Sequence, residues 1–250
     1  MRAASSEARA AGVNEGDRVM CVVRFGSYSE RVDLPWQQAL PLPESWSFEE
    51  GAAFPVQAIT ALYAMDLGGV TDAKANGRCS EPPAVLVHSA AGGTGLAACE
   101  IAKRVGCRSV MTVSSASKAE FLRERFPEAR AEDVLVRAPA AQFGAQLQAS
   151  APAGLAAVLD SLGGAYFKPA YDALAPCGRH VVFGAADWTP KGDKVSLWGW
   201  VRLAWSAVIN RPTLAPMDMP GTWLHSPCDP ISTRWQSGTH CRAWLSYHLC

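Results

Sequence analysis

The segment that most constrains the fold of this chain is AVLVHSAAGGTG, at residues 84–95. It begins as an apolar run, passes through a turn of small residues and continues into a sequence that is compatible with a helix. A dinucleotide diphosphate needs this combination, because it binds at a tight turn where the backbone comes close and helix N–H groups are free. The segment therefore favours a nucleotide-dependent oxidoreductase.

The turn matches the dinucleotide fingerprint G-x-G-x-x-G at two of its three glycine positions. Ala90 stands at the first position, Gly92 and Gly95 at the second and third, and Gly93 lies between them. Gly92 still permits close approach of phosphates, and Gly95 still permits a helix to pack on its strand. A glycine cluster of this kind also occurs as a plain structural turn, and that alternative stays open.

The segments after the turn alternate between helix and strand patterns. The helix after the turn should close at Gly106, and the next helix should open with a capping box formed by Ser117 and Glu120. Regular alternation predicts an α/β fold with a doubly wound parallel sheet. The expected strands are 110–113, 134–136, 157–159 and 180–183, and the expected helices between them are 117–126, 141–149 and 166–174, the last weakened by Pro169.

The end of the second strand distinguishes between the two nicotinamide cofactors. An NAD site usually has an acidic residue there, whereas this sequence has Ser114, Ser115 and Lys118 and no acid before Glu120. Hydroxyl groups and an ammonium bind a 2′-phosphate, which a carboxylate repels, so NADPH is favoured over NADH. The alternative is that these residues are only turn, cap and solvated helix residues.

The region before the turn is rich in β-strand and turn signals. Residues 16–20 and 24–30 are predicted to be strands joined by a glycine turn. A helix should start after Ser47, with Glu50 three residues on, and a second helix over 57–65 should follow Pro55.

Composition excludes some classes of function. The chain has 250 residues, 49% of them hydrophobic, and 23 acidic residues balance 23 Lys and Arg residues, so nucleic acid is not an expected partner. Met1 is not followed by an apolar signal core, so we expect a cytoplasmic protein whose cysteines are reduced. The Cys and His residues of the last 30 positions match no zinc-ligand spacing, and no metal is expected.

Five segments together resemble the zinc-free quinone oxidoreductase (zeta-crystallin-like) branch of the medium-chain dehydrogenase/reductase superfamily. They are, in order, GDRVMCVVRFGSYSERVDLP, PLPESWSFEEGAAFPVQAITALYAM, AVLVHSAAGGTGLAACEIAKRVG, VLDSLGG and LAPCGRHVVFGA. The stretch WGWVRLAWSAVINRPTLAPMDM is most similar to the vesicle amine transport protein subgroup. The resemblance implies an NADPH-dependent, dimeric enzyme that reduces quinones or α,β-unsaturated carbonyls, with a small-molecule substrate.

The resemblance also implies a division of the chain. Residues 1–55 would be part of a GroES-like catalytic domain, residues 56–219 a Rossmann NADP-binding domain with a Trp-rich lid helix, and residues 220–250 a divergent, disordered tail. The Trp-rich segment 197–209 contains Arg202 and is shorter than the roughly 20 residues that cross a bilayer. Contact with a membrane surface stays open for it.

The resemblance assigns cofactor contacts residue by residue. The diphosphate loop would be Ala90, Gly92, Gly93 and Gly95, the 2′-phosphate contacts Ser114 and Lys118 with Ser115 beside them, and the nicotinamide-side contacts Thr60, Phe183 and Gly184. Thr60 and Phe183 also have simpler explanations, as a helix residue with a backbone-bonded hydroxyl and as a core residue. No acid or base for the reaction is assigned, because His88 and His180 fit buried, hydrogen-bonded positions better.

The sequence departs from the family at both ends. Family members have a longer segment before GDRV, with most of the catalytic domain, and they continue differently after Met219. Three hypotheses therefore stand: an NADPH-dependent reductase impaired by truncation, a cofactor-binding interaction protein without turnover, and an inactive isoform. Consumption of NADPH with a small quinone distinguishes the first from the other two.

Overall fold

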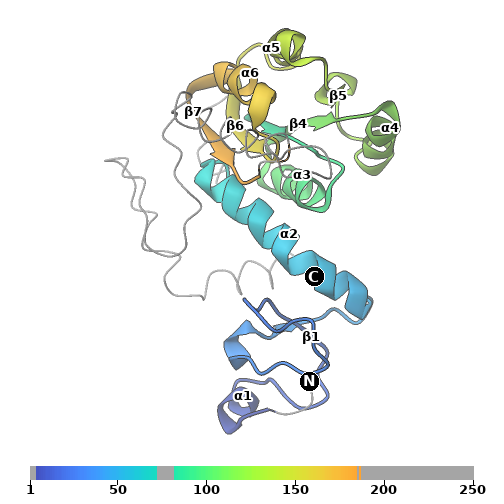
Figure 1. The fold of residues 1–250 in the computed structure, drawn as a ribbon, viewed down its shortest axis with the longest axis vertical. Coiled ribbons are helices and arrows are strands. Elements are labelled where there is room, and N and C mark those ends of the chain that lie inside the picture. The colour runs from blue at the N-terminus through green and yellow to red at the C-terminus, as the bar shows by residue number, and fades with distance from the viewer. Residues whose placement is uncertain (1–3, 72–81, 185, 187–250) are drawn as a thin grey trace, which may run out of the picture. The chain divides into compact units, whose positions relative to one another are not determined.

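The computed structural model describes residues 4–71, 82–184 and 186, and these fall into two compact units that divide between Pro55 and Val56 (Figure 1). The first unit contains short elements: α1 (Ser6–Ala10), β1 (Val19–Met20), a 3-10 turn at Trp36–Gln38, β2 (Leu40–Pro41) and the start of α2 (Phe48–Leu67). Strands β1 and β2 pair antiparallel. The GroES-like character of this unit stays a prediction.

Two expectations for this part of the chain are wrong. Residues 24–30 form no strand, and the side chains of Phe25 and Tyr28 are exposed; a strand needs a neighbour for its backbone groups. Helix α2 also runs unbroken through Pro55, where two helices were expected. The expected capping box at its start is confirmed, since Ser47 N–H donates to Glu50 Oε2 at 2.7 Å and Glu50 N–H donates to Ser47 Oγ at 3.1 Å.

The second unit is built on a five-stranded sheet in the order β5-β4-β3-β6-β7, with every neighbouring pair parallel. In chain order this is 3-2-1-4-5, the arrangement of a Rossmann fold. The predicted α/β class and parallel sheet are therefore confirmed. The strands are β3 (Ala84–Val87), β4 (Arg108–Val113), β5 (Val134–Val136), β6 (Leu155–Asp160) and β7 (Leu174–Val182).

Helices cover both faces of this sheet (Figure 1). Alternate strand residues such as Leu86, Val110 and Val158 form a fully buried cluster with α5 (Ala140–Ser150) and α6 (Phe167–Asp172). The residues between them, such as Met111, turn to the side of α3 (Gly93–Val105) and α4 (Ala116–Arg125). The short strands are apolar on both faces because both are buried.

The helix ends follow local sequence signals, with one correction. Gly106 ends α3 in the left-handed conformation at φ 79°, as the sequence predicted. Helix α4 begins one residue earlier than expected, and its cap is Ser115 rather than Ser117. Pro169 lies in the first turn of α6, after a 3-10 turn at Gly164–Tyr166, where its missing N–H breaks no helix bond.

The Trp-rich segment and the tail lie outside the described residues, so the lid and disorder predictions are not addressed by this structure. Among the described residues, no helix combines the length and hydropathy that crossing a bilayer requires.

Candidate cofactor site

The turn after β3 brings the backbone of α3 close to the strand. Ser89 takes a left-handed conformation at φ 53°. Ala90 N–H donates to Thr112 O at 3.1 Å, and Gly92 N–H donates to Ser89 O at 2.8 Å. A Cβ on Gly95 would lie only 2.5 Å from Ser89 O and 2.6 Å from Ala90 Cα. Gly95 therefore performs the third glycine's role of close helix-strand packing.

The start of α3 offers three N–H groups to a ligand. The amides of Gly93, Thr94 and Gly95 have no acceptor within the described part of the chain, and Leu96 N–H is the first to bond back, to Gly92 O at 2.8 Å. Gly92 is exposed and has an extended backbone at φ −84°. Free N–H groups and the positive end of a 13-residue helix favour an anion here.

The strand ends beside this turn are tied together at the switch point of the sheet, between β3 and β6. Ser161 Oγ donates to His88 O at 3.4 Å, and Phe183 N–H donates to Asp160 O at 2.9 Å. A Cβ on Gly184 would lie 2.5 Å from Ser161 O, so only glycine permits this approach. Ligands of open α/β sheets bind outside the strand ends at this point. Phe183 and Gly184, two predicted contacts, thus lie at the edge where the glycine turn lies.

The residues that were predicted to determine whether NADPH or NADH binds lie at the end of β4. Ser114 and Lys118 are exposed, and the Lys118 ammonium has no ion pair within the described residues. Ser115 Oγ accepts Lys118 N–H at 3.4 Å and lies 3.1 Å from Ser117 Oγ. The Ser115 hydroxyl is therefore engaged as a helix cap, which leaves Ser114 and Lys118 as the groups open to a phosphate.

Helix α2 brings a residue to the glycine turn that sequence reasoning missed. A Cβ built on Gly93 would overlap the carboxamide of Gln57, with Oε1 as the nearest atom and Nε2 at 2.6 Å. Thr60, the predicted contact, is half-buried one turn further along α2. No sequence signal links Gln57 to Gly93, because the two are far apart in the chain and meet only in the fold.

A row of buried polar side chains lies below the strand ends on the α5 and α6 face. His88 Nδ1 is 3.0 Å from Thr112 Oγ1, and His180 Nε2 is 3.0 Å from Asp160 Oδ2. Asp160 Oδ1 also accepts the N–H groups of Leu162 and Gly163, at 2.8 and 2.9 Å. The expectation that both histidines are buried and hydrogen-bonded is correct.

Burial and hydrogen bonding determine the ionisation of His88 and Asp160 in this row. Burial lowers the pKa of His88 to about 4, so this ring is neutral at pH 7. Burial also acts to raise the pKa of Asp160, but the hydrogen bond from His180 and the other nearby donors outweigh it and lower that pKa. Asp160 is therefore ionised and orders the loop after β6.

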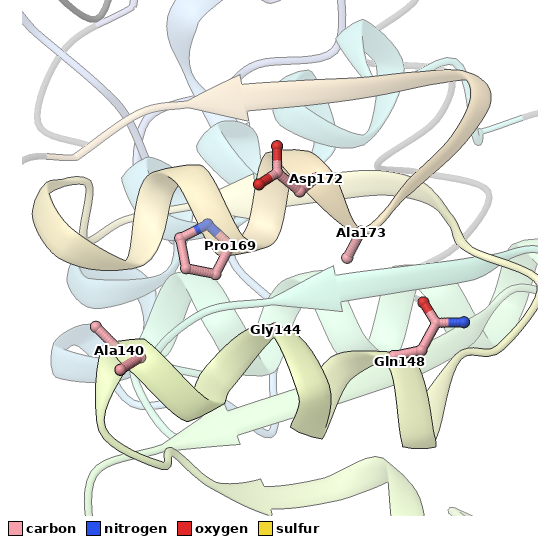
Figure 2. Close-up of a pocket in the computed structure, with 7 residues that line it drawn as sticks. Ala140, Gly144, Gln148, Pro169, Asp172 and Ala173 are labelled. Atoms are coloured by element: carbon pink, nitrogen blue, oxygen red, sulfur yellow. The ribbon is translucent and has the colours of Figure 1, made fainter.

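Two hollows in the described part of the second unit lie away from these residues. One, of about 300 Å³, lies between α5 and α6 (Figure 2) and is lined by Ala140, Ala141, Gly144, Gln148, Pro169, Asp172 and Ala173. Another of similar volume lies near the start of β4, beside Cys99, Lys103 and Phe126. Neither hollow includes a predicted cofactor contact.

The cysteines and metal ligands add little to the site. Cys99 and Cys107 are buried, Cys21 is half-buried and Cys177 is exposed, and all four are free thiols. Burial raises the pKa of Cys99 to about 12 and that of Cys107 to about 11, which makes both unreactive. Within residues 4–71 and 82–184, no group of His, Cys, Asp and Glu side chains is arranged to hold a metal ion.

Comparisons with known proteins agree with this geometry. Residues 93–203 match a family model described as zinc-binding dehydrogenase. The chain is 33% identical over 192 residues to the synaptic vesicle membrane protein VAT-1 homolog of Rattus norvegicus, covering 76% of this chain and 44% of the relative. It is 34% identical over 179 residues to highly-reducing polyketide synthase 1 of Aureobasidium melanogenum, covering 71% of this chain and 8% of that protein.

Solved structures share the fold. The quinone oxidoreductase of Thermus thermophilus, solved also with NADPH, is 31% identical with a TM-score of 0.54, covering 77% of this chain and 56% of that one. In sequence and in fold the chain is similar to members of the medium-chain dehydrogenase/reductase superfamily. A mycobacterial protein complexed with NADPH is 25% identical with a TM-score of 0.60, covering 86% and 71% of the two chains.

The resemblance to quinone oxidoreductases is therefore confirmed in sequence and in fold. The chain spans less than half the length of the VAT-1 relatives it matches. The described unit contains the glycine turn and five parallel strands in the order of a Rossmann nucleotide-binding fold.

Proposed function

We propose that this chain is an NADPH-dependent oxidoreductase that reduces quinones or α,β-unsaturated carbonyl compounds by hydride transfer. The observation that favours this most is the trio of N–H groups at the start of α3 that find no acceptor among the described residues, beside an exposed Gly92 at the switch point of the sheet. The solved structures that resemble it include a quinone oxidoreductase and a probable oxidoreductase, by their names.

The residues of this site fit a dinucleotide phosphate. The diphosphate would accept hydrogen bonds from the N–H groups of Gly93, Thr94 and Gly95, and the exposed Gly92 leaves room for it. Ser114 and Lys118 would hold the 2′-phosphate, which supports NADPH over NADH. The ends of β6 and β7, with Phe183 and Gly184, would border the nicotinamide half, and Thr60 would approach it from α2.

The protein's part in the reaction would be binding and orientation. The bound cofactor supplies a hydride, and the protein needs no side-chain nucleophile for its transfer. Asp160 holds the N–H groups of Leu162 and Gly163, and Gly184 packs on Ser161, so the strand ends that would border the nicotinamide are fixed before binding. A rigid border orients the hydride toward an acceptor. No residue is proposed as proton donor.

Similarity to VAT-1 homologues favours a second candidate, a cofactor-binding protein that acts through interaction. The relatives are described as synaptic vesicle membrane proteins, so a cytoplasmic location and contact with a membrane surface both remain predictions for this chain. A homodimer and independence of zinc remain predictions as well.

Oxidation of NADPH by a small quinone tests the proposal. The chain is mixed with NADPH and a 1,4-benzoquinone or 1,4-naphthoquinone, and loss of NADPH absorbance is followed against a blank without protein and against NADH. We expect saturable, NADPH-preferring consumption. NADPH binding without any turnover of quinones or enones would contradict the reductase and favour the interaction protein.

A further inference from the structure

Gln57 lies at the proposed diphosphate subsite, although its helix is remote from the glycine turn in sequence. The carboxamide stands where a Cβ of Gly93 would be, and Gly93 is the first residue of α3. Gln57 belongs to the same compact unit as the turn, and its residue is exposed to solvent. A carboxamide beside the first N–H groups of α3 can reach an anion bound by them.

The Gln57 carboxamide is not engaged by the part of the protein that the structure describes. Within the described residues its oxygen and nitrogen make no hydrogen bond, whereas two other glutamines of the unit do: Gln146 binds the backbone of Val136 and Ala138, and Gln148 binds that of Pro152. A glutamine carboxamide has two N–H donors. Those of Gln57 are therefore available to a ligand at the turn.

We propose that Gln57 is a further cofactor-binding residue, whose carboxamide donates a hydrogen bond to the cofactor's diphosphate beside the N–H groups of α3. The inference rests on the proposed function, because it assumes that the dinucleotide binds at this turn. It adds a side-chain donor from α2 to a subsite otherwise made of backbone. Because the diphosphate is common to NADPH and NADH, Gln57 sets affinity for both and does not choose between them.

Two charged substitutions of Gln57 test this role, because they should change cofactor affinity in opposite directions. Gln57→Glu places a carboxylate against the diphosphate and should weaken NADPH and NADH binding at least tenfold at pH 7.5. Gln57→Lys places an ammonium there and should tighten both several-fold, a gain that misfolding cannot produce. Both effects should shrink in high salt. Binding is measured by titration of cofactor fluorescence with the full chain.

Two controls separate a local contact from a general charge effect. Val56 is exposed and adjacent on α2, so Val56→Glu and Val56→Lys change the net charge equally and should alter affinity by less than twofold. Adenosine 2′-monophosphate lacks the diphosphate, so its affinity should be the same for wild type and both Gln57 variants.

The outcomes distinguish this inference from the function on which it rests. Wild type that binds NADPH, with Gln57 variants indistinguishable from the Val56 variants, overturns the role of Gln57 alone. Gln57 variants that change the affinity for NADPH but not for NADH overturn that role as well. Wild type that binds neither cofactor overturns both the proposed function and this inference.

Discussion

At the scale of single residues, Lys118 is the group that would distinguish NADPH from NADH. Its ammonium is exposed at the end of β4 and has no ion pair within the described residues, so it is available to a 2′-phosphate. Lys118→Ala should weaken NADPH binding by about 1.5–3 kcal/mol, the usual scale for a hydrogen bond to a charged group, and leave NADH binding unchanged.

Lys103→Ala is the matched control, because it removes the same charge from the far end of α3, where Lys103 pairs with Glu128 at 2.6 Å. It should change neither affinity. Fluorescence titration with each cofactor measures both variants, and equal losses of NADPH and NADH affinity in Lys118→Ala would show that Lys118 does not contact the 2′-phosphate.

His88 should make the protein sensitive to acid. Its pKa is about 4 in the fold, because burial disfavours the imidazolium, and returns to about 6.5 on unfolding. The unfolded chain therefore binds more protons between these values, and stability is complete above the unfolded pKa and falls as the pH drops. Between pH 7 and pH 5 this residue should remove about 2 kcal/mol from the free energy of unfolding.

His88→Leu isolates this effect, since Asp160 and His180 are unchanged in the variant. Denaturant unfolding at pH 7 and pH 5 should show a drop that is smaller by about 2 kcal/mol in His88→Leu than in wild type. Equal drops in the two proteins would mean that His88 is not held neutral by burial.

At the scale of elements, the packing of α3 on β3 depends on Gly95. A methyl group there would meet the backbone of Ser89 and Ala90 at 2.5–2.8 Å, so α3 must move away from the strand. Gly95→Ala should destabilise the protein by about 1–3 kcal/mol, as overpacking usually does.

The same substitution in α5 should have the opposite sign. Gly144 is a helix residue whose added Cβ would meet only Pro169, at 3.9 Å, so Gly144→Ala should stabilise by up to about 1 kcal/mol through helix propensity. Urea unfolding compares the two variants, and a Gly95→Ala protein as stable as wild type would contradict the close packing of α3.

Local signals explain which elements the sequence could predict. The strand, glycine turn and helix of residues 84–106 were predictable because apolar spacing and glycine positions act within a few residues. The cap of α4 was misplaced by two residues because Ser115 and Ser117 both lie at the start of the same helix, and only the backbone shows which one accepts the Lys118 N–H. The unbroken α2 was missed because Pro55 removes one backbone hydrogen bond of the helix, and such a loss usually kinks or ends a helix.

Contacts between distant segments explain what the sequence could not predict. Gln57 meets Gly93, and His180 meets Asp160, only after the sheet has formed. The predicted contacts at the turn, at Ser114 and Lys118 and at Phe183 and Gly184 all lie beyond the carboxyl ends of strands of one sheet, β3, β4 and β7. Their order along the chain indicated this common edge, because carboxyl ends of parallel strands meet there.

At the scale of the whole molecule, one unit, from Val56 onward, contains the proposed subsites for a dinucleotide at the edge of its sheet. The chain spans less than half of the length of its VAT-1 relatives, and the proposed cofactor subsites all lie in this one unit. Binding of NADPH is therefore the central claim.

Titration of NADPH fluorescence with wild type and Gly92→Val tests that claim most directly. Gly92 is exposed, its backbone is extended, and an added Cβ would lie 3.3 Å from Ser89 O, so the variant should keep its fold and its circular dichroism spectrum. Its branched side chain would stand where the diphosphate approaches. We expect saturable NADPH binding by wild type and none by a folded Gly92→Val protein. Equal NADPH affinity in the two proteins would mean that the glycine turn is only structural.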